Sequence, residues 1–179
     1  MNTIRFLNPS VFSAILLTFS LLTSSIAGAQ ISINEVLYDP SGSDTGLEFV
    51  EIINTSASAI DMSGFELKLA DSNYFTFPSF SIPGNGRILV HNNLTGSHTP
   101  TEFFTGPLTN MGNTAGSVAL FSGAHATTNI IDFMQYGASG QQWESAAVAA
   151  TIWTSGDAIA DAPEGVSVNL DPDSVDSNS

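Results

Sequence analysis

The chain contains no cysteine among its 179 residues. This absence excludes disulfide bonds, thiolate metal ligands, cysteine nucleophiles and a lipid-modified N-terminal cysteine. A folded domain must therefore take its stability from a hydrophobic core. Because 42% of the residues are hydrophobic and 12 of them are phenylalanine, a domain of this length can bury enough apolar surface without covalent cross-links.

Basic residues are almost as scarce. The chain has 17 acidic residues but only three basic ones, Arg5, Lys68 and Arg87, and its formal net charge is −14. Nucleic acid and anionic membrane surfaces are not expected as partners, because both are bound through clustered Lys and Arg. The acidic excess identifies no ligand, since a high net charge of one sign mainly keeps a protein soluble and monomeric. We therefore expect a monomer.

Long apolar runs are also absent, except for one near the N-terminus. Arg5 precedes an uncharged apolar run over residues 11–22, and an Ala-Gly-Ala segment of the cleavage-site pattern ends at Ala29. This order is typical of a secretory signal peptide, so residues 1–29 are predicted to be removed and Gln30 to become the first residue. A membrane anchor is the alternative, but the run is shorter than the roughly 20 residues that cross a bilayer. We expect a secreted protein, extracellular or periplasmic, without a transmembrane segment.

From Ile31 onward, short β-rich runs alternate with clusters of Gly, Pro, Asn, Asp and Ser. This rhythm predicts an antiparallel sandwich or barrel. In the run over residues 64–70, apolar side chains alternate with Glu66 and Lys68, which predicts one buried face and one wet face. The predicted strands are Ile31–Tyr38, Glu48–Asn54, Gly64–Ala70, Tyr74–Phe77, Gly86–His91, Ser117–Phe121, Ile130–Tyr136 and Val166–Leu170.

Two local irregularities are also predicted. The apolar phase of the first strand changes at Asn34–Glu35, which indicates a β-bulge there. The segment Ile82–Asn85 fits a type II turn in which Pro83 presets φ and Gly84 takes the positive φ of the next position.

The last part of the chain departs from the strand rhythm. Residues 141–152 are rich in Ala and predict either a short helix or an extended loop across one end of the sandwich. Beyond residue 157 the composition becomes acidic and rich in Ser, and residues 171–179 are expected to form a disordered acidic tail. One domain is therefore predicted over residues 30–170.

The order of these segments resembles the lamin-tail domain, a β-sandwich found at the end of nuclear lamins and in many exported bacterial proteins. The resembling pieces are Ile33–Val36, Glu48–Asn54, Asp61–Leu67, Tyr74–Phe77, Ile82–Gly84 with Arg87–Val90, Leu108–Asn110 with Gly112-Asn113, Val118–Phe121 and Asp132–Gly137. Together they run from Ile31 to Gly137, and more loosely over Glu164–Leu170. The resemblance, of the exported bacterial type, implies an all-β, immunoglobulin-like antiparallel β-sandwich that serves binding or display and has no catalytic residues.

One metal hypothesis follows from the residues. Asp39, Asp44 and Glu48 place carboxylates on or beside one loop, and Ca²⁺ prefers such oxygen ligands. The loop lacks the spacing of an EF-hand, so solvated acidic side chains are the alternative. A second acidic group, Asp171, Asp173 and Asp176, lies in the expected tail. Calcium is the only candidate cofactor.

Two tryptophans are candidates for ligand stacking. Exposed faces of Trp143 and Trp153 could stack on sugar rings, whereas burial in the core is the alternative for such large apolar groups. The three histidines, His91, His98 and His125, stand in no metal-binding pattern. No nucleophile-elbow motif occurs either. We therefore expect a protein that is not an enzyme.

The sequence thus predicts a secreted or cell-envelope module for binding or scaffolding. A protein or a surface glycan is the expected partner, engaged by loops or exposed sheet edges. A carbohydrate-binding module, assisted by calcium, is the first alternative. An accessory domain of a hydrolase is the second.

Overall fold

The computed structural model describes residues 30–70 and 73–169. The predicted signal peptide and the predicted acidic tail both lie outside the described residues. The elements along the chain are β1 (Ile31–Leu37), β2 (Phe49–Asn54), β3 (Ile60–Asp61), β4 (Glu66–Ala70), β5 (Asn73–Thr76), β6 (Ser81–Ile82), β7 (Arg87–His91), β8 (Glu102–Phe104), β9 (Gly116–Phe121), β10 (Ile130–Tyr136), α1 (Glu144–Ala149) and β11 (Val168–Asn169).

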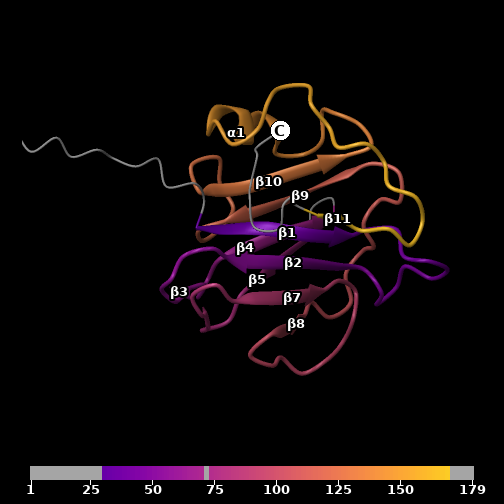
Figure 1. Cartoon of the computed structure of the whole chain (residues 1–179). Helices are drawn as coiled ribbons and strands as arrows, with labels where there is room; N and C mark the ends of the chain where they lie inside the picture. The colour runs from indigo at the N-terminus through magenta and orange to yellow at the C-terminus, as the bar shows by residue number, and fades with distance from the viewer. Residues whose placement is uncertain (1–29, 71–72, 170–179) are drawn as a thin grey trace, which may run out of the picture.

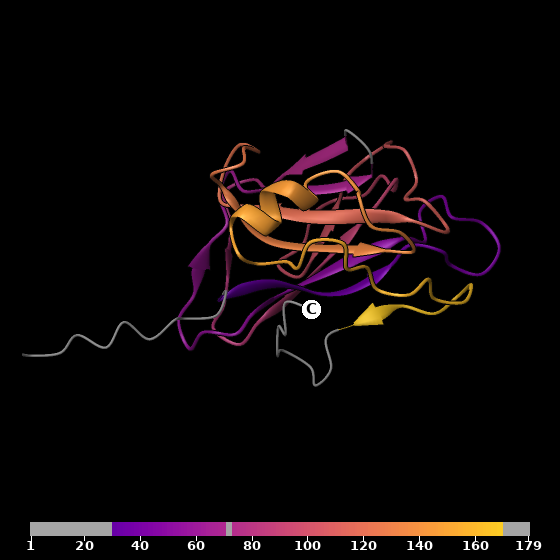
Figure 2. The same ribbon diagram turned by 90° about the horizontal axis from the view of Figure 1, so that it is seen from above.

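These strands build a sandwich of two main sheets (Figures 1 and 2). One sheet has the order β11-β1-β2-β7-β8 and the other β10-β9-β4-β5, while β3 and β6 form a small separate ribbon. The pairings are antiparallel except for β7 with β8, which run parallel. The predicted all-β sandwich is confirmed, with this one parallel pair added to it.

The core lies between the two sheets, where the inward residues of both meet. From β4, Leu67 and Leu69 are buried as the alternation predicted. Lys68 departs from the prediction, because its exposed fraction is only 3% although it belongs to the outward face. The reason is a third layer, which covers part of that face.

Helix α1 supplies this third layer over the outer face of the four-stranded sheet (Figure 2). Its buried residues Ala146 and Ala147 belong to the core cluster, as does Trp153, whose ring meets that of Phe133 on β10 edge to face at 5.3 Å. The helical alternative for residues 141–152 is therefore the one observed. Within the described residues, no helix is long and apolar enough to cross a membrane.

The two predicted irregularities have different outcomes. The register of β1 and β2 shifts between Ile33 and Glu35, which confirms the bulge. The turn prediction is wrong by one position: the amide of Gly86 donates to the carbonyl of Pro83, and Asn85 carries the positive φ of 57°. Gly84 is required for another reason, because a Cβ there would lie 2.2 Å from the carbonyl oxygen of Ala57.

Candidate functional site

A polar pocket of about 190 Å³ opens on the outer face of the four-stranded sheet, beside the segment that leads into α1. Such a volume holds several water molecules, or one small polar unit of a ligand. The pocket is lined by Lys68, Leu69, Ala70, Asn110, Gly112, Ala115, Gly116, Ser117, Tyr136, Gln141 and Gln142. Except for Tyr136 of β10, these residues come from β4, from β9, from the segment before β9 and from the segment between β10 and α1.

Lys68 is the only lysine of the chain, and it lines this pocket. Its ammonium donates to the carbonyl oxygen of Ser117 at 2.9 Å and to the Ser117 hydroxyl at 3.0 Å. That hydroxyl in turn donates to the carbonyl of Gln142 at 2.9 Å. A buried charge requires such partners, so Lys68 and Ser117 hold the segment before α1 in place.

The residue that follows Gln142 has a strained backbone. Trp143 precedes the helix with a φ of 76°, a conformation that bulky residues rarely adopt. Its indole N–H donates to the Tyr74 hydroxyl at 3.0 Å, and its ring meets that of Phe121 at 4.9 Å. These contacts offset the strain, which is often found where a side chain is held for function.

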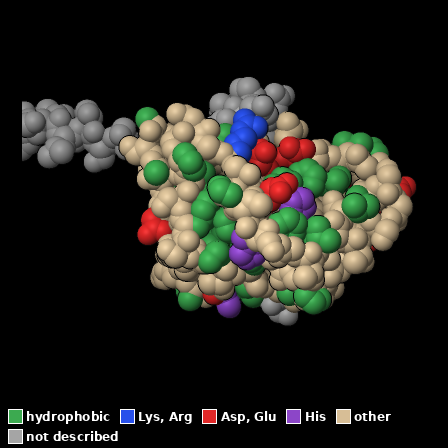
Figure 3. Space-filling model, turned by 90° about the horizontal axis from the view of Figure 1, so that it is seen from below, with side chains coloured by type: hydrophobic (Ala, Val, Ile, Leu, Met, Phe, Trp, Pro, Cys, Tyr) green, Lys and Arg blue, Asp and Glu red, His purple; other side chains and the backbone are tan. Residues whose placement is uncertain are grey.

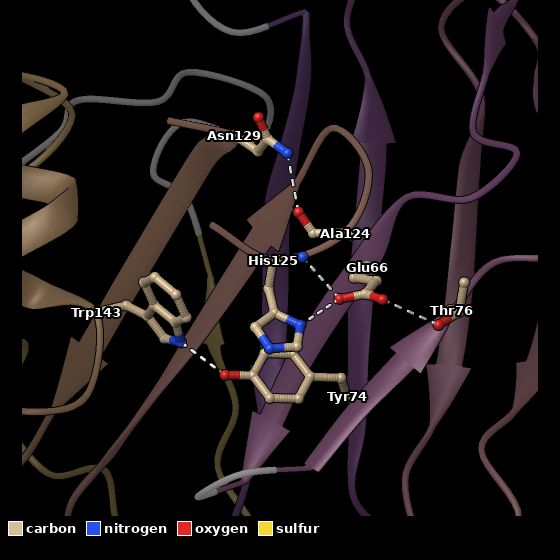
Figure 4. Close-up of polar contacts among 7 residues, drawn as sticks. All are labelled: Glu66, Tyr74, Thr76, Ala124, His125, Asn129 and Trp143. Atoms are coloured by element: carbon tan, nitrogen blue, oxygen red, sulfur yellow. Dashed lines mark hydrogen bonds and ion pairs between the residues drawn. The ribbon is translucent and has the colours of Figure 1, made fainter. Parts of the chain in front are cut away.

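Tyr74 connects the rings to the pocket. It lies directly opposite Lys68 in the β4–β5 register, and such cross-strand neighbours point to the same face of a sheet. Its ring stacks on that of His125, with centroids 3.7 Å apart and planes inclined by 10°. Tyr74, His125 and Trp143 form a group that we call the ring cluster (Figure 4). It adjoins the pocket through Lys68, the cross-strand neighbour of Tyr74, and through Gln142, the residue before Trp143.

Glu66 orients His125 within the ring cluster. One carboxylate oxygen of Glu66 accepts from the His125 backbone amide at 2.8 Å and contacts its Nδ1, while the other accepts from Thr76 (Figure 4). Burial alone would raise the pKa of Glu66, but the hydrogen bonds and the charge of His125 lower it overall. The ionised carboxylate therefore accepts a hydrogen bond from the Nδ1–H of His125, which holds the imidazole in a fixed orientation.

The predicted calcium ligands divide into two groups. Asp39 and Asp44 both accept from the side-chain amide of Asn113, at 2.9 and 3.5 Å. Burial and the nearby charges of Glu164, Asp44 and Asp161 raise the pKa of Asp39. In the described part of the chain, no group of three or more His, Cys, Asp or Glu side chains is arranged to hold a metal ion.

Glu48 lies behind this loop and is completely buried. Its carboxylate accepts from the Met111 backbone amide at 2.8 and 3.0 Å and from the Asn92 side chain at 2.6 Å. Burial raises its pKa to about 7, against the effect of these hydrogen bonds. These two donors tie the start of β2 to the end of β7 and to the segment before β9.

The two tryptophans proposed for stacking also have different surroundings. Trp153 has an exposed fraction of 7%, and its indole N–H donates to the carbonyl of Asp157. Trp143 is only partly buried and belongs to the ring cluster. Of the two rings, Trp143 is the one that lies next to a pocket.

Sequence reasoning did not single out Lys68, Ser117, Tyr74 or Glu66 as site residues. One signal was present in the sequence: a single lysine in a strongly acidic chain occupies the middle of a predicted strand. The other residues carried no local signal, because Ser117 and His125 approach β4 and β5 only through sheet pairing.

Comparison with known proteins agrees with the fold. Residues 24–173 match the family model of the lamin tail domain. No curated protein matches the chain. Since the family match spans most of the sequence, and the structure has the β-sandwich that this family implies, the chain belongs to the lamin tail domain family.

Proposed function

We propose that this protein is an exported, non-catalytic binding module of the lamin-tail type, and that the pocket beside α1 with its ring cluster is the binding site. The observation that carries the proposal is the pocket itself, a polar cavity of about 190 Å³ whose walls are held by buried hydrogen bonds. A concave site with convergent polar groups is the usual form of a ligand site.

The chemistry of the pocket supports binding rather than catalysis. Among its lining residues that the structure describes, none is Asp, Glu or His. General acid–base catalysis uses such a group, or a Lys or Tyr, within hydrogen-bond reach of the substrate. The lining Lys68 and Tyr136 instead donate to protein atoms, the ammonium to Ser117 and the phenol to the carbonyl of Gly112. The carboxylate of Glu66 and the imidazole of His125 do not line the pocket. Their hydrogen bond, together with the stack of His125 on Tyr74, orients the imidazole within the ring cluster.

The remaining surface offers less for a ligand to bind. The exposed large hydrophobic side chains in the described segments are Leu47 and Val166. On the face turned away from α1, hydrophobic side chains are interspersed with acidic and histidine side chains (Figure 3). Isolated apolar side chains of this kind are normal on a soluble protein and mark no interface.

Export and binding can be tested in one experiment. The full chain, expressed in a secreting host, should yield a product in the medium or envelope whose mass and N-terminal sequence begin at Gln30. A photo-reactive amino acid placed at Gln142 should then cross-link a defined partner from the envelope fraction, whereas the same group at Val166 should not. A chain that stays in the cytoplasm, or equal labelling from both positions, contradicts the proposal.

A calcium ion between Asp39 and Asp44 is a second proposal, which would assist binding at the end of the sandwich. The supporting observation is electrostatic: burial first, and then the carboxylates of Glu164, Asp44 and Asp161, raise the pKa of Asp39, and a bound divalent cation would relieve the repulsion between the carboxylates. Thermal melts with and without millimolar Ca²⁺ test it, because a ligand of the native state raises Tm. The variant Asp44→Asn should lose the increase, and an unchanged Tm of the wild-type protein would exclude this site.

A further inference from the structure

We infer that the pocket beside α1 takes one sugar unit of an uncharged glycan. This inference rests on the proposed function and names the ligand class of the same site.

The charges around the pocket disfavour ionic ligands of either sign. An anionic ligand approaches a chain with a formal net charge of −14 and is repelled at long range. A cationic ligand meets the ammonium of Lys68, which lines the pocket and repels a like charge. An apolar ligand is also disfavoured, because it would remove water from polar walls without replacing the hydrogen bonds. A neutral, hydroxyl-rich ligand meets none of these penalties.

The polar groups of the pocket match hydroxyl groups. Gln142 is exposed, and none of the hydrogen bonds within the described residues uses its side-chain amide, which offers both a donor and an acceptor. The Ser117 hydroxyl accepts from Lys68 and donates to the carbonyl of Gln142, and its remaining lone pair can accept from a ligand. A sugar hydroxyl can donate to one such group and accept from another, so a ring with several hydroxyls can use these groups at the same time.

The ring cluster provides the apolar complement that a sugar also needs. The C–H face of a sugar ring packs on aromatic side chains, and such side chains contribute much of the contact area at binding sites. Trp143 follows Gln142 directly in the chain, and its indole N–H donates to the Tyr74 hydroxyl, which holds the two rings together. A glycan whose terminal unit enters the pocket would therefore pass over these rings.

The test uses the mature protein and an array of neutral and uronic-acid-containing oligosaccharides, followed by isothermal titration with the best neutral ligand. We expect binding to neutral glycans, and a Kd that rises about tenfold or more in Gln142→Ala, equivalent to ~1.4 kcal/mol. The matched control is Ser145→Ala, an exposed position in the first turn of α1 outside the pocket, which should keep the wild-type Kd.

A second variant tests the rings. Trp143→Asn removes the indole but accepts a positive φ, so the fold should survive, as a thermal melt can verify. Its affinity for the neutral glycan should fall by a similar factor. The inference is overturned if the array shows no binding, if only uronic-acid glycans bind, or if both variants keep the wild-type Kd. Cross-linking of a protein partner at Gln142 without glycan binding would also overturn it, yet would leave the proposed function intact.

Discussion

Glu48 and Glu66 both lie at the start of a strand, yet one is buried in the core and the other lies on the outer face of a sheet. Glu48 directly precedes β2, and Glu66 is the first residue of β4. Glu48 is completely buried and bonds only to uncharged donors, and its pKa rises to about 7. Glu66 lies on the outer face beside His125, and its pKa is lowered.

The difference separates a structural region from a candidate binding region. Glu48 satisfies buried amides, so its role is to join three segments of the chain. Glu66 orients an exposed ring next to a pocket, so removing it should change the surface more than the core. Environment, not residue type, decides which role a carboxylate has.

The largest effect is expected from Glu48→Ala. This change leaves the Met111 amide and the Asn92 side chain buried without their acceptor, which should lower the free energy of unfolding by about 3 kcal/mol. Denaturant unfolding at neutral pH measures it. Glu66→Ala is the matched comparison and should lose less than about 1 kcal/mol. Equal losses in the two variants would contradict the distinction between the two regions.

The next largest effect is expected in the pH dependence of the free energy of unfolding, through the buried carboxyl group of Glu48. Because the pKa of Glu48 is about 7 in the folded state and 4.5 in its unperturbed state, the folded protein retains this proton to higher pH than the unfolded chain. The stabilisation is therefore complete below about pH 4.5 and is lost as the pH rises through 7, by on the order of 3 kcal/mol. Urea titrations between these pH values measure it, and Glu48→Gln should abolish this dependence. A wild-type stability that rises over the same interval, with Glu48→Gln unchanged, would contradict the assignment.

In the ring cluster, Tyr74→Phe should have a moderate effect. The variant keeps the ring stacked on His125 but removes the acceptor of the Trp143 indole N–H, which should cost about 1 kcal/mol. Thermal and urea unfolding measure the change, and the intrinsic fluorescence of Trp143 should shift with it. Thr76→Val is the control, because it removes an exposed hydroxyl of the same strand at 3.4 Å from Glu66. An effect as large in the control would show that the indole hydrogen bond contributes nothing specific.

The smallest effect is expected from Glu66→Gln. Since the folded-state pKa of Glu66 lies below its usual 4.5, its stabilisation is present above about pH 4.5 and is lost as the pH falls through the folded-state pKa. The pair is near the surface, so the gain should be only roughly 0.5 kcal/mol. The difference between wild type and variant should thus disappear at low pH, opposite in direction to the Glu48 effect. A difference that grows on acidification would contradict this sign.

The alternation of side chains predicted much of the strand content. Ile130–Tyr136 was predicted with the bounds that β10 has, and the bulge in β1 was visible as a change of apolar phase. The short β3, β6 and β8 were missed. Two or three residues are too few to show a period, and the parallel pairing of β8 with β7 has no local signature.

The candidate site was much less predictable. Trp143 was singled out for its ring, but its neighbours Tyr74 and His125 are 69 and 18 residues away along the chain and meet it only in the folded sheet. Glu48 was assigned to a calcium-binding loop, whereas its oxygens accept from Met111 and Asn92. Proximity of carboxylates in the sequence did not reveal which of them faced inward.

By itself, the sequence predicted an export signal and determined the alternating strands, the acidic composition and the family resemblance, because each of these is a local or compositional property. Only the tertiary structure decided that the single lysine is buried under the segment before α1 and that a pocket forms there. The physical reason is that burial and pKa depend on which distant segments cover a residue, and that covering is set by the packing of α1 on the sheet.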